Sequence, residues 1–208
     1  MKTMNIFFFG DSICFGQLIS PHKTWVTKIA QELEKLPSGE KIRVINSSVN
    51  GNTTRMALER MPFDIQEYGI VDILLIQFGL NDCNYWETDH GHPRVSKMAF
   101  KANILEIIER ARIFGCQKIF LNTNHPTLKT NLMKNTTFSF QQSNEEYNQI
   151  IREVAKNSRT RLIDIELFWQ KGIKIDLSLK NLLLPDGLHL SAAGHNLYFE
   201  IVFPIIKK

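Results

Sequence analysis

The sequence predicts an α/β protein in which a parallel β-sheet is covered by helices on both faces. Five short apolar runs alternate along the chain with segments whose apolar residues recur at helical spacing, which is typical of that architecture. Because the runs are apolar at nearly every position, each is expected to be a strand buried on both sides. The predicted strands are Asn5–Phe9, Ile42–Val49, Val71–Phe78, Lys118–Asn122 and Arg161–Ile165.

Four amphipathic helices are expected between and after these strands. Gly115 is placed to end the second helix, and Ser191 to begin the fourth. Ser143 and Glu146 form a candidate capping box at the start of the third helix. The predicted apolar stripes are, in chain order, Val26, Ile29, Leu33 and Leu36; Phe100, Ile104, Ile107, Ile108 and Ala111; Tyr147, Ile150, Ile151 and Val154; and Leu197, Tyr198, Ile201, Val202 and Ile205.

Composition narrows the class of protein. The 208 residues are 43% hydrophobic and 22% charged, which is ordinary for a globular chain, and residues 1–208 are expected to form one domain. The net charge of +4 is not concentrated in any stretch, so no nucleic-acid partner is expected. No apolar run is long enough for a membrane helix or a secretory leader, so no membrane insertion is expected. Cys14, Cys83 and Cys116 are odd in number and widely spaced, which argues against a disulfide framework and favours a cytoplasmic protein.

Four short blocks of polar and small residues lie where strands are expected to end. In an open α/β sheet, ligands collect at the carboxyl ends of the strands. Together the blocks supply a serine, a backbone amide, a side-chain amide and an Asp/His pair, which are the groups that an acyl-transferring serine hydrolase needs. The blocks are Gly10-Asp11-Ser12, Asn50-Gly51-Asn52-Thr53-Thr54, Gly79-Leu80-Asn81-Asp82 and Asp186-Gly187-Leu188-His189.

Ser12 is the candidate nucleophile and His189 its candidate base. A Gly-Asp turn after the first strand can hold a hydroxyl clear of the sheet, although a plain surface turn has the same composition. A catalytic histidine needs one ring nitrogen facing the serine and the other held by an acceptor, and Asp186 lies three residues before His189. Taken alone, the Asp186 block is more simply a turn that leads into a helix. The presence of Ser12 favours the catalytic interpretation.

Gly51 and Asn81 are candidate donors to the negative oxygen of a tetrahedral intermediate. A glycine allows the backbone to approach a substrate closely, and an asparagine offers two N–H donors without a competing charge. Each block is singly compatible with an ordinary turn or loop start. Because all four occur together and in this order, they predict one active site.

With these residues the chain resembles the SGNH, or GDSL-type, esterase and lipase superfamily, which is named for a Ser, a Gly, an Asn and a His in four blocks. The matching residues are Ser12, Gly51, Asn81 and His189, with Asp186 at the position of the family's aspartate. The resemblance covers nearly the whole chain and implies a three-layer α/β/α, flavodoxin-like fold with about five parallel strands. It also implies an oxyanion hole built from the Ser12 N–H, the Gly51 N–H and the Asn81 side chain.

The chain departs from the family's pattern only beside these positions. Ile13 stands where many members have Leu, Asn52 where Asp is frequent, and Ser48 where a small residue, often Gly, is frequent. Leu80 replaces a common Gly or small residue and adds bulk beside the implied oxyanion hole, so it bears on substrate shape. The implied reaction is two-step acyl transfer, and it requires no metal and no organic cofactor.

Asp11, Leu80, Tyr85, Trp86 and His125 are candidate substrate-lining residues. Tyr85 and Trp86 belong to the long polar segment 83–97, and His125 opens the second such segment, 125–142. Long loops at strand ends usually shape a site or cover it. The two aromatics suit stacking against a sugar ring, and they equally suit the anchoring of a loop.

Two other features are predicted to carry no chemistry. Asp89, His90 and His92 resemble a metal-ligand pattern, but no further ligand cluster accompanies them, so no metal site is predicted. Cys14 lies two residues after the candidate nucleophile and lacks a dedicated base, so a small buried apolar role is expected.

The predicted function is hydrolysis of carboxylic esters, with a small-molecule ester as substrate. The polar segment 83–97 favours a short acyl chain, such as an O-acetyl group on a sugar or sugar-derived metabolite. A lysophospholipase or thioesterase with the same site is the alternative within enzymes. An O-acyltransferase and a catalytically silent carbohydrate-binding protein are the alternatives from other classes.

Overall fold

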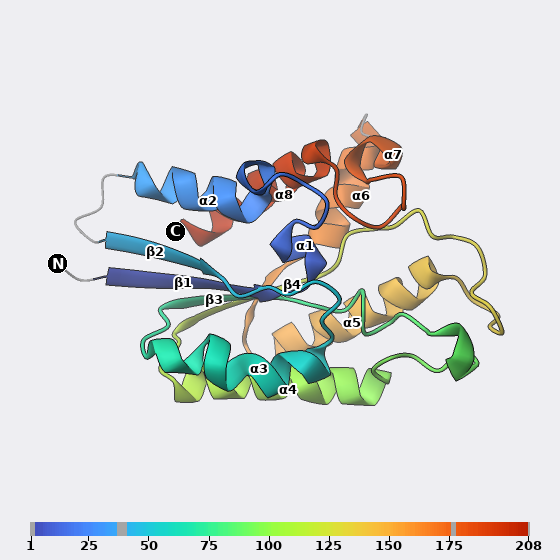
Figure 1. The fold of residues 1–208 in the computed structure, drawn as a ribbon, viewed down its shortest axis with the longest axis horizontal. Coiled ribbons are helices and arrows are strands. Elements are labelled where there is room, and N and C mark those ends of the chain that lie inside the picture. Colours follow the sequence, from blue (N-terminus) through green and yellow to red (C-terminus); the bar gives the residue numbers. More distant parts are fainter. Residues whose placement is uncertain (1–2, 37–40, 176–177, 208) are drawn as a thin grey trace.

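The computed structural model describes residues 3–36, 41–175 and 178–207, and it contains a five-stranded parallel sheet between two layers of helices (Figure 1). The strand order is β2-β1-β3-β4-β5, and every neighbouring pair is parallel. This arrangement confirms the expected three-layer α/β/α fold with the flavodoxin-like strand order. The strands are β1 (Thr3–Gly10), β2 (Lys41–Asn46), β3 (Ile73–Gln77), β4 (Lys118–Asn122) and β5 (Arg161–Ile163).

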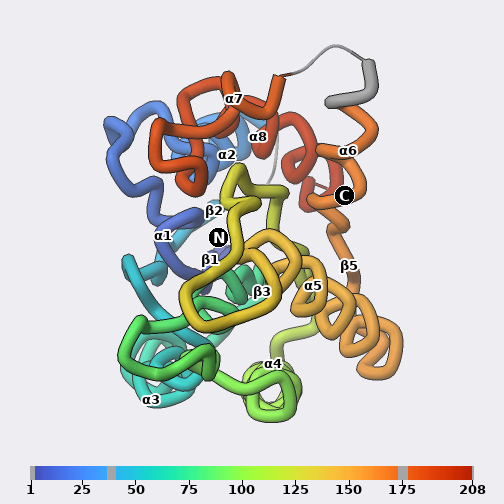
Figure 2. Tube along the Cα trace, turned by 90° about the vertical axis from the view of Figure 1, so that its right-hand side faces the viewer, coloured from blue at the N-terminus to red at the C-terminus, as the bar shows by residue number. Residues whose placement is uncertain are grey.

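Helices α2, α6 and α8 cover one face of the sheet, and α3, α4 and α5 cover the other (Figures 1 and 2). The helices are α1 (Ser12–Phe15), α2 (Trp25–Glu34), α3 (Thr54–Asp64), α4 (Lys97–Ile113), α5 (Phe140–Asn157), α6 (Ile165–Ile175), α7 (Leu179–Leu182) and α8 (Ala192–Ile206). Three short 3₁₀ helices are η1 (Pro21–Lys23), η2 (Gln66–Tyr68) and η3 (Glu87–Asp89). Among the described residues, no helix combines the length and the apolar character needed to cross a membrane.

The two central strands, β1 and β3, set the position of the site. Every residue of β3 is buried, as are the last five residues of β1, because helices pack on both faces. After β1 the chain leaves toward the face covered by α2, whereas after β3 it leaves toward the face covered by α4 (Figure 1). Such a divergence opens a crevice at the carboxyl ends of the two strands, where ligands of α/β proteins bind.

The strand predictions are confirmed for β4 and corrected elsewhere. β2 ends at Asn46 instead of Val49, although the N–H groups of Ser47 and Val49 still donate to the Phe8 and Gly10 carbonyls of β1, at 2.9 and 3.1 Å. β5 ends at Ile163, and Ile165 instead begins α6. β1 is longer than predicted, and β3 is shorter at both ends.

The helix predictions are confirmed in full for α4, whose five predicted residues are all buried and which is followed by Gly115 at φ +83°. In α2 the stripe stops at Leu33, since Leu36 lies beyond the helix and is exposed. The capping box of α5 was predicted at the wrong residues. Ser139 and Gln142 form it, whereas Ser143 is buried within the helix and donates to the Cys83 carbonyl at 3.1 Å.

The last helix begins as predicted, with Ser191 as the N-cap of α8. Its fully buried residues include Tyr198 and Val202, as predicted. At its end the prediction is off by one position, because Ile206 is buried and Ile205 only half-buried.

Candidate active site

The side chains of Ser12, His189 and Asp186 lie in hydrogen-bond contact at the carboxyl end of β1. Ser12 Oγ is 3.0 Å from His189 Nε2, and His189 Nδ1 is 2.6 Å from Asp186 Oδ2. Because a carboxylate can only accept, Nδ1 carries the proton and Nε2 is left to accept the hydroxyl proton of Ser12. The fold therefore brings together a hydroxyl, an imidazole and a carboxylate from residues at opposite ends of the chain.

Ser12 is presented by a single helical turn that follows β1 directly. Asp11 caps this turn, its Oδ1 accepting the Ile13 N–H at 2.9 Å, and Gly16 ends it at φ +83°. A side chain at Gly16 would also collide, since a Cβ there would lie 2.2 Å from a methyl group of Thr24. The Ser12 N–H, at the first helical position, donates no hydrogen bond within the described residues and is free to meet a substrate oxygen.

Asp11 is fully buried beside the nucleophile. Burial raises the pKa of Asp11 to about 7, with a further contribution from the charge of Asp82, while the hydrogen bond from the Ile13 N–H acts in the opposite direction. A carboxyl group that is partly protonated near neutral pH places less negative charge next to the hydroxyl of Ser12.

The turn that carries Asp186 and His189 is held by its own backbone. Asp186 Oδ1 accepts hydrogen bonds from the N–H groups of Leu188 and His189, each at 2.9 Å. Gly187, which follows Asp186, adopts φ +68° in this turn. The Leu184 N–H donates to the His189 carbonyl at 2.7 Å and closes the turn. Burial opposes ionisation, but the hydrogen bonds from His189 and the two amides prevail and hold the pKa of Asp186 below its usual value.

A single arginine holds both of the other predicted oxyanion-hole residues. Arg94 Nη2 donates to the Gly51 carbonyl at 3.1 Å, and Arg94 Nη1 donates to Asn81 Oδ1 at 3.3 Å. Because the guanidinium occupies the carbonyl end of Asn81, the amide nitrogen is the end left for other partners. Gly51 adopts φ +75°, which residues with side chains rarely do, and its N–H donates no hydrogen bond within the described part of the chain.

Arg60 joins the first block to the second and was not singled out from the sequence. Its guanidinium donates to the Gly10 carbonyl at 3.2 Å, to the Ser47 carbonyl at 2.6 Å and to Asn52 Oδ1 at 2.6 Å. It also forms an ion pair with Asp64 one helical turn away. These contacts explain why Asn52 serves where an aspartate is frequent, since it still offers the arginine an acceptor oxygen.

Asp82 joins the third block to the second. Its Oδ1 accepts both the N–H of Thr54, at 2.9 Å, and the hydroxyl of Thr54, at 2.5 Å, at the start of α3. Burial raises the pKa of Asp82 to about 6, and the hydrogen bonds from Thr54 and the charge of Arg94 limit the rise. Asp82 thus fixes the loop that carries Asn81 to the helix that follows Gly51.

The structure distributes the five predicted lining residues unevenly. Asp11, Leu80 and His125 are buried in the interior, which differs from the expectation that they face a substrate. Tyr85 is half-buried and packs against Phe138, with ring centroids 5.5 Å apart, so it anchors its loop. Trp86 is 56% exposed and lines a pocket.

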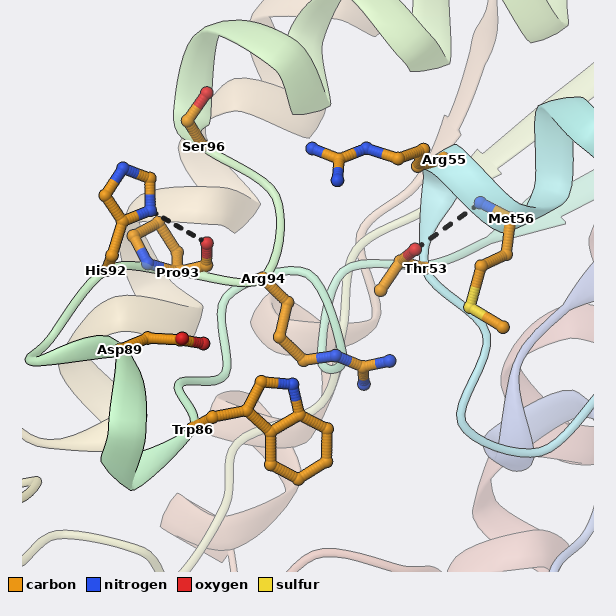
Figure 3. A pocket seen from close by; sticks show the side chains of 9 residues that line it. All are labelled: Thr53, Arg55, Met56, Trp86, Asp89, His92, Pro93, Arg94 and Ser96. Carbon is orange, nitrogen blue, oxygen red and sulfur yellow. Dashed lines mark hydrogen bonds between the residues drawn. The ribbon is translucent and has the colours of Figure 1, made fainter.

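This pocket has a volume of about 540 Å³ and is lined by Arg94 (Figure 3). Arg94 connects it to Gly51 and Asn81, whose oxygens accept from its guanidinium, but the lining residues include neither of these two nor Ser12. One wall comes from the start of α3, and the other from residues 86–96 of the first long loop. Asp89 and His92 line it together with the arginines, but in the described ranges no three His, Cys, Asp or Glu side chains gather as metal ligands.

The second long loop, 125–142, instead packs on the turn that carries Asp186 and His189. The Leu128 N–H donates to the Gly187 carbonyl at 2.9 Å, and a Cβ at Gly187 would lie 3.0 Å from the Leu128 Cβ. His125 supports the same turn from the protein interior, since its Nε2 donates to the Leu188 carbonyl at 2.8 Å. Cys14 is a free, buried thiol whose pKa burial raises well above its usual value, in keeping with a packing role.

Comparison with known proteins places the chain among the carboxylic ester hydrolases. The model of the GDSL-like Lipase/Acylhydrolase family matches residues 8–197, so the chain belongs to that family. It is 26% identical to the uncharacterized lipoprotein YqeF of Bacillus subtilis, over 91% of this chain and 86% of that protein. It is also 26% identical to the isoamyl acetate-hydrolyzing esterase 1 homolog of Rattus norvegicus, over 98% of this chain and 81% of that protein. An acetylxylan esterase from Geobacillus stearothermophilus shares the fold, with a TM-score of 0.77, 19% identity and coverage of 99% of this chain and 94% of that one.

Proposed function

We propose that this chain is a serine esterase that removes short acyl groups, above all acetyl groups, from a sugar or another small polar metabolite. The observation that carries the mechanism is the continuous line of hydrogen bonds from Asp186 through His189 to Ser12, at 2.6 and 3.0 Å. Such a line activates a hydroxyl that is otherwise a weak nucleophile.

The proposed reaction proceeds through an acyl-enzyme. His189 Nε2 takes the hydroxyl proton of Ser12 while Ser12 Oγ bonds to the ester carbonyl carbon. The N–H groups of Ser12 and Gly51 and the amide nitrogen of Asn81 stabilise the negative oxygen, and each such donor contributes roughly 10²- to 10³-fold to kcat. His189 then gives its proton to the departing alcohol.

The second half repeats the chemistry with water. His189 takes a proton from water, the resulting hydroxide attacks the acyl carbon, and the same proton returns to Ser12 Oγ as the acid leaves. Throughout, Asp186 holds the imidazole in one orientation and stabilises its positive form.

The pocket supports a polar alcohol part of the substrate. Arg55, Asp89, His92 and Arg94 place charged or polar groups along its walls, which suit a sugar. The exposed ring of Trp86 offers a flat face for a sugar. Two relatives support an acetyl group: the rat protein is named for isoamyl acetate and the Geobacillus enzyme for acetylxylan.

The test is hydrolysis of 4-nitrophenyl acetate, butyrate and octanoate by the wild type and by Ser12→Ala. We expect acetate to be the best substrate and Ser12→Ala to be inactive. A preference for octanoate would instead indicate a lysophospholipase or thioesterase. Acyl transfer to a sugar hydroxyl that outcompetes hydrolysis would indicate a transferase. No turnover together with no labelling of Ser12 by a small fluorophosphonate would indicate a silent binding protein.

The cytoplasmic location stays a prediction. The three cysteines are free and buried in the structure, while the Bacillus subtilis relative is a lipoprotein by name. Fractionation of cells that produce the native protein, with detection by antibody, would separate a cytoplasmic from a membrane-anchored form.

A further inference from the structure

We propose that the pocket lined by Arg94 binds a carboxylate on the alcohol part of the substrate, and that Arg55 selects it. The inference rests on the proposed esterase function and deepens it, because it names acidic sugars that carry O-acetyl groups as the substrate class. Arg55 is then a specificity-determining residue that binds substrate away from the reacting bond.

The fixed charges of the pocket leave an excess of positive charge. Arg55 and Arg94 contribute two positive charges to its walls, and Asp89 contributes one negative charge. The hydrogen-bond acceptors of Arg94 are the Gly51 carbonyl and Asn81 Oδ1, and both are neutral. The groups that hold Arg94 in place therefore do not cancel its charge, but the buried carboxyl of Asp82 is close enough to offset part of it. The excess positive charge rests mainly on Arg55.

Of the two arginines that line the pocket, Arg55 is the one available to bind a ligand. It is exposed, and within the described residues it makes no hydrogen bond and no ion pair, unlike Arg60 on the same helix. Figure 3 shows its side chain extending from the start of α3 over the pocket. A guanidinium presents a planar fork of N–H donors that matches the two oxygens of a carboxylate.

One helix start adds to the positive field. Ser96, the N-cap of α4, lines the pocket, and the amino end of a helix carries a partial positive charge that stabilises anions near it. Thr53, the N-cap of α3, also lines the pocket, but there the Asp82 carboxyl already accepts the Thr54 N–H at 2.9 Å. The pocket thus receives the dipole of α4 together with two guanidinium groups.

The remaining wall suits a sugar ring. The ring of Trp86 is exposed, and the Arg94 guanidinium lies over one of its faces, 5.1 Å from its centre, so the opposite face is the one left for a sugar ring. Asp89 offers acceptor oxygens for sugar hydroxyls on another side (Figure 3). A volume of about 540 Å³ is within the usual range for small-molecule sites.

The first measurement compares two matched esters, an acetylated methyl glucoside and the same acetylated methyl glucuronoside, which differ only in CH₂OH against carboxylate. Release of acetate gives kcat/KM for each. We expect the wild type to favour the glucuronoside by roughly ten- to a hundredfold, the usual range for a hydrogen bond to a charged group. Arg55→Gln should bring this ratio close to one. Arg43→Gln, which removes the same charge from an exposed position on β2, should leave the ratio unchanged.

The second measurement does not need turnover. Ligand-observed NMR records the binding of unacetylated methyl glucuronoside and methyl glucoside to Ser12→Ala, with and without Arg55→Gln. We expect the glucuronoside to bind more tightly, and the difference to disappear with Arg55→Gln. Retained folding of each variant is checked by thermal unfolding.

The outcomes separate the two proposals. Equal hydrolysis of both esters by the wild type, or a preference that survives Arg55→Gln, would overturn the carboxylate subsite and leave the esterase function standing. Arg55-dependent binding of the glucuronoside without hydrolysis of any ester would support the subsite and contradict the esterase function. Absence of glucuronoside binding and of any preference in hydrolysis would overturn the subsite.

Discussion

Replacement of Arg94 by alanine should lower kcat more than it changes KM. Arg94 makes no proposed contact with the reacting atoms, yet it donates to the Gly51 carbonyl and to Asn81 Oδ1 at 3.1 and 3.3 Å. Without it, the Asn81 amide is free to rotate, and a rotated amide presents its oxygen to the developing oxyanion instead of its nitrogen. Arg94 is therefore a positioning residue for the oxyanion hole.

The size of the effect follows from what is lost. A hydrogen bond from a charged donor contributes about 1.5–3 kcal/mol to stability. Only the share of this energy that keeps Asn81 and Gly51 oriented toward the oxyanion affects kcat. The upper limit is the complete loss of one oxyanion donor, about 10²- to 10³-fold in kcat. We therefore expect Arg94→Ala to reduce kcat for 4-nitrophenyl acetate by about ten- to a hundredfold. The kcat of Arg94→Lys should lie between those of the wild type and Arg94→Ala, since a single ammonium group cannot reproduce the planar guanidinium that donates to two acceptors.

A double-mutant cycle with Asn81→Ala tests the reasoning. If Arg94 acts through Asn81, Arg94→Ala should cost much less in kcat once Asn81 is already alanine. Arg43→Ala on β2 is the control for the loss of an exposed arginine. An unchanged kcat with a raised KM, or fully additive losses in the cycle, would refute the positioning role. Thermal unfolding of each variant separates a loss of orientation from a loss of folding.

Three further predictions concern the catalytic turn and its support. Asp186→Asn removes the charge that orients His189, so kcat should fall by about 10³- to 10⁴-fold, with thermal unfolding used to confirm that the variant is folded in the assay. Activity within tenfold of the wild type would count against Asp186. Burial lowers the pKa of His125 to about 4, below its value near 6.5 in the unfolded chain, so the folded state binds fewer protons. The stability that results is present above about pH 6.5 and is lost as the pH falls toward 4, by up to about 3 kcal/mol. Urea unfolding from about pH 4 to pH 7.5 should show a weaker dependence in His125→Gln, and equal dependence would contradict this assignment. Gly194→Ala would place a Cβ 2.1 Å from the Leu182 carbonyl oxygen, so the free energy of unfolding should drop by about 1–3 kcal/mol or more, measured by the same urea method.

The end of an element was predicted correctly where a single sequence feature marks it. It was misplaced where two positions carry the same feature, or where pairing with another strand continues beyond the regular element. α4 was predicted residue by residue because its apolar stripe and Gly115 are read from consecutive turns of one helix. β2 was overextended because Ser47 and Val49 still hydrogen-bond to β1 without belonging to the regular strand. The capping box of α5 was misplaced because Ser139 and Gln142 carry the same signature four residues earlier.

The same distinction holds for the site. Ser12, Gly51, Asn81 and the Asp186 turn each stand in a short block with a recognisable composition, and the structure places the blocks at one edge of the sheet. The residues that join the blocks have no such mark. Arg94 binds a backbone carbonyl and a neutral side chain from two different loops, so neither charge pairing nor spacing in the sequence indicates its position.

His125 shows why a polar residue at the end of a strand need not face the substrate. Its Nε2 lies 2.8 Å from the Leu188 carbonyl, which can only accept, so this nitrogen carries the proton. Its Nδ1 must then accept from the Tyr198 hydroxyl at 3.0 Å, and both nitrogens are satisfied in the neutral form. Burial lowers the pKa of His125, and the nearby His189 lowers it further. The two histidines thus have opposite requirements: His189 must take up a proton in each half of the proposed reaction, and a neutral His125 holds the turn beneath it without repelling that charge.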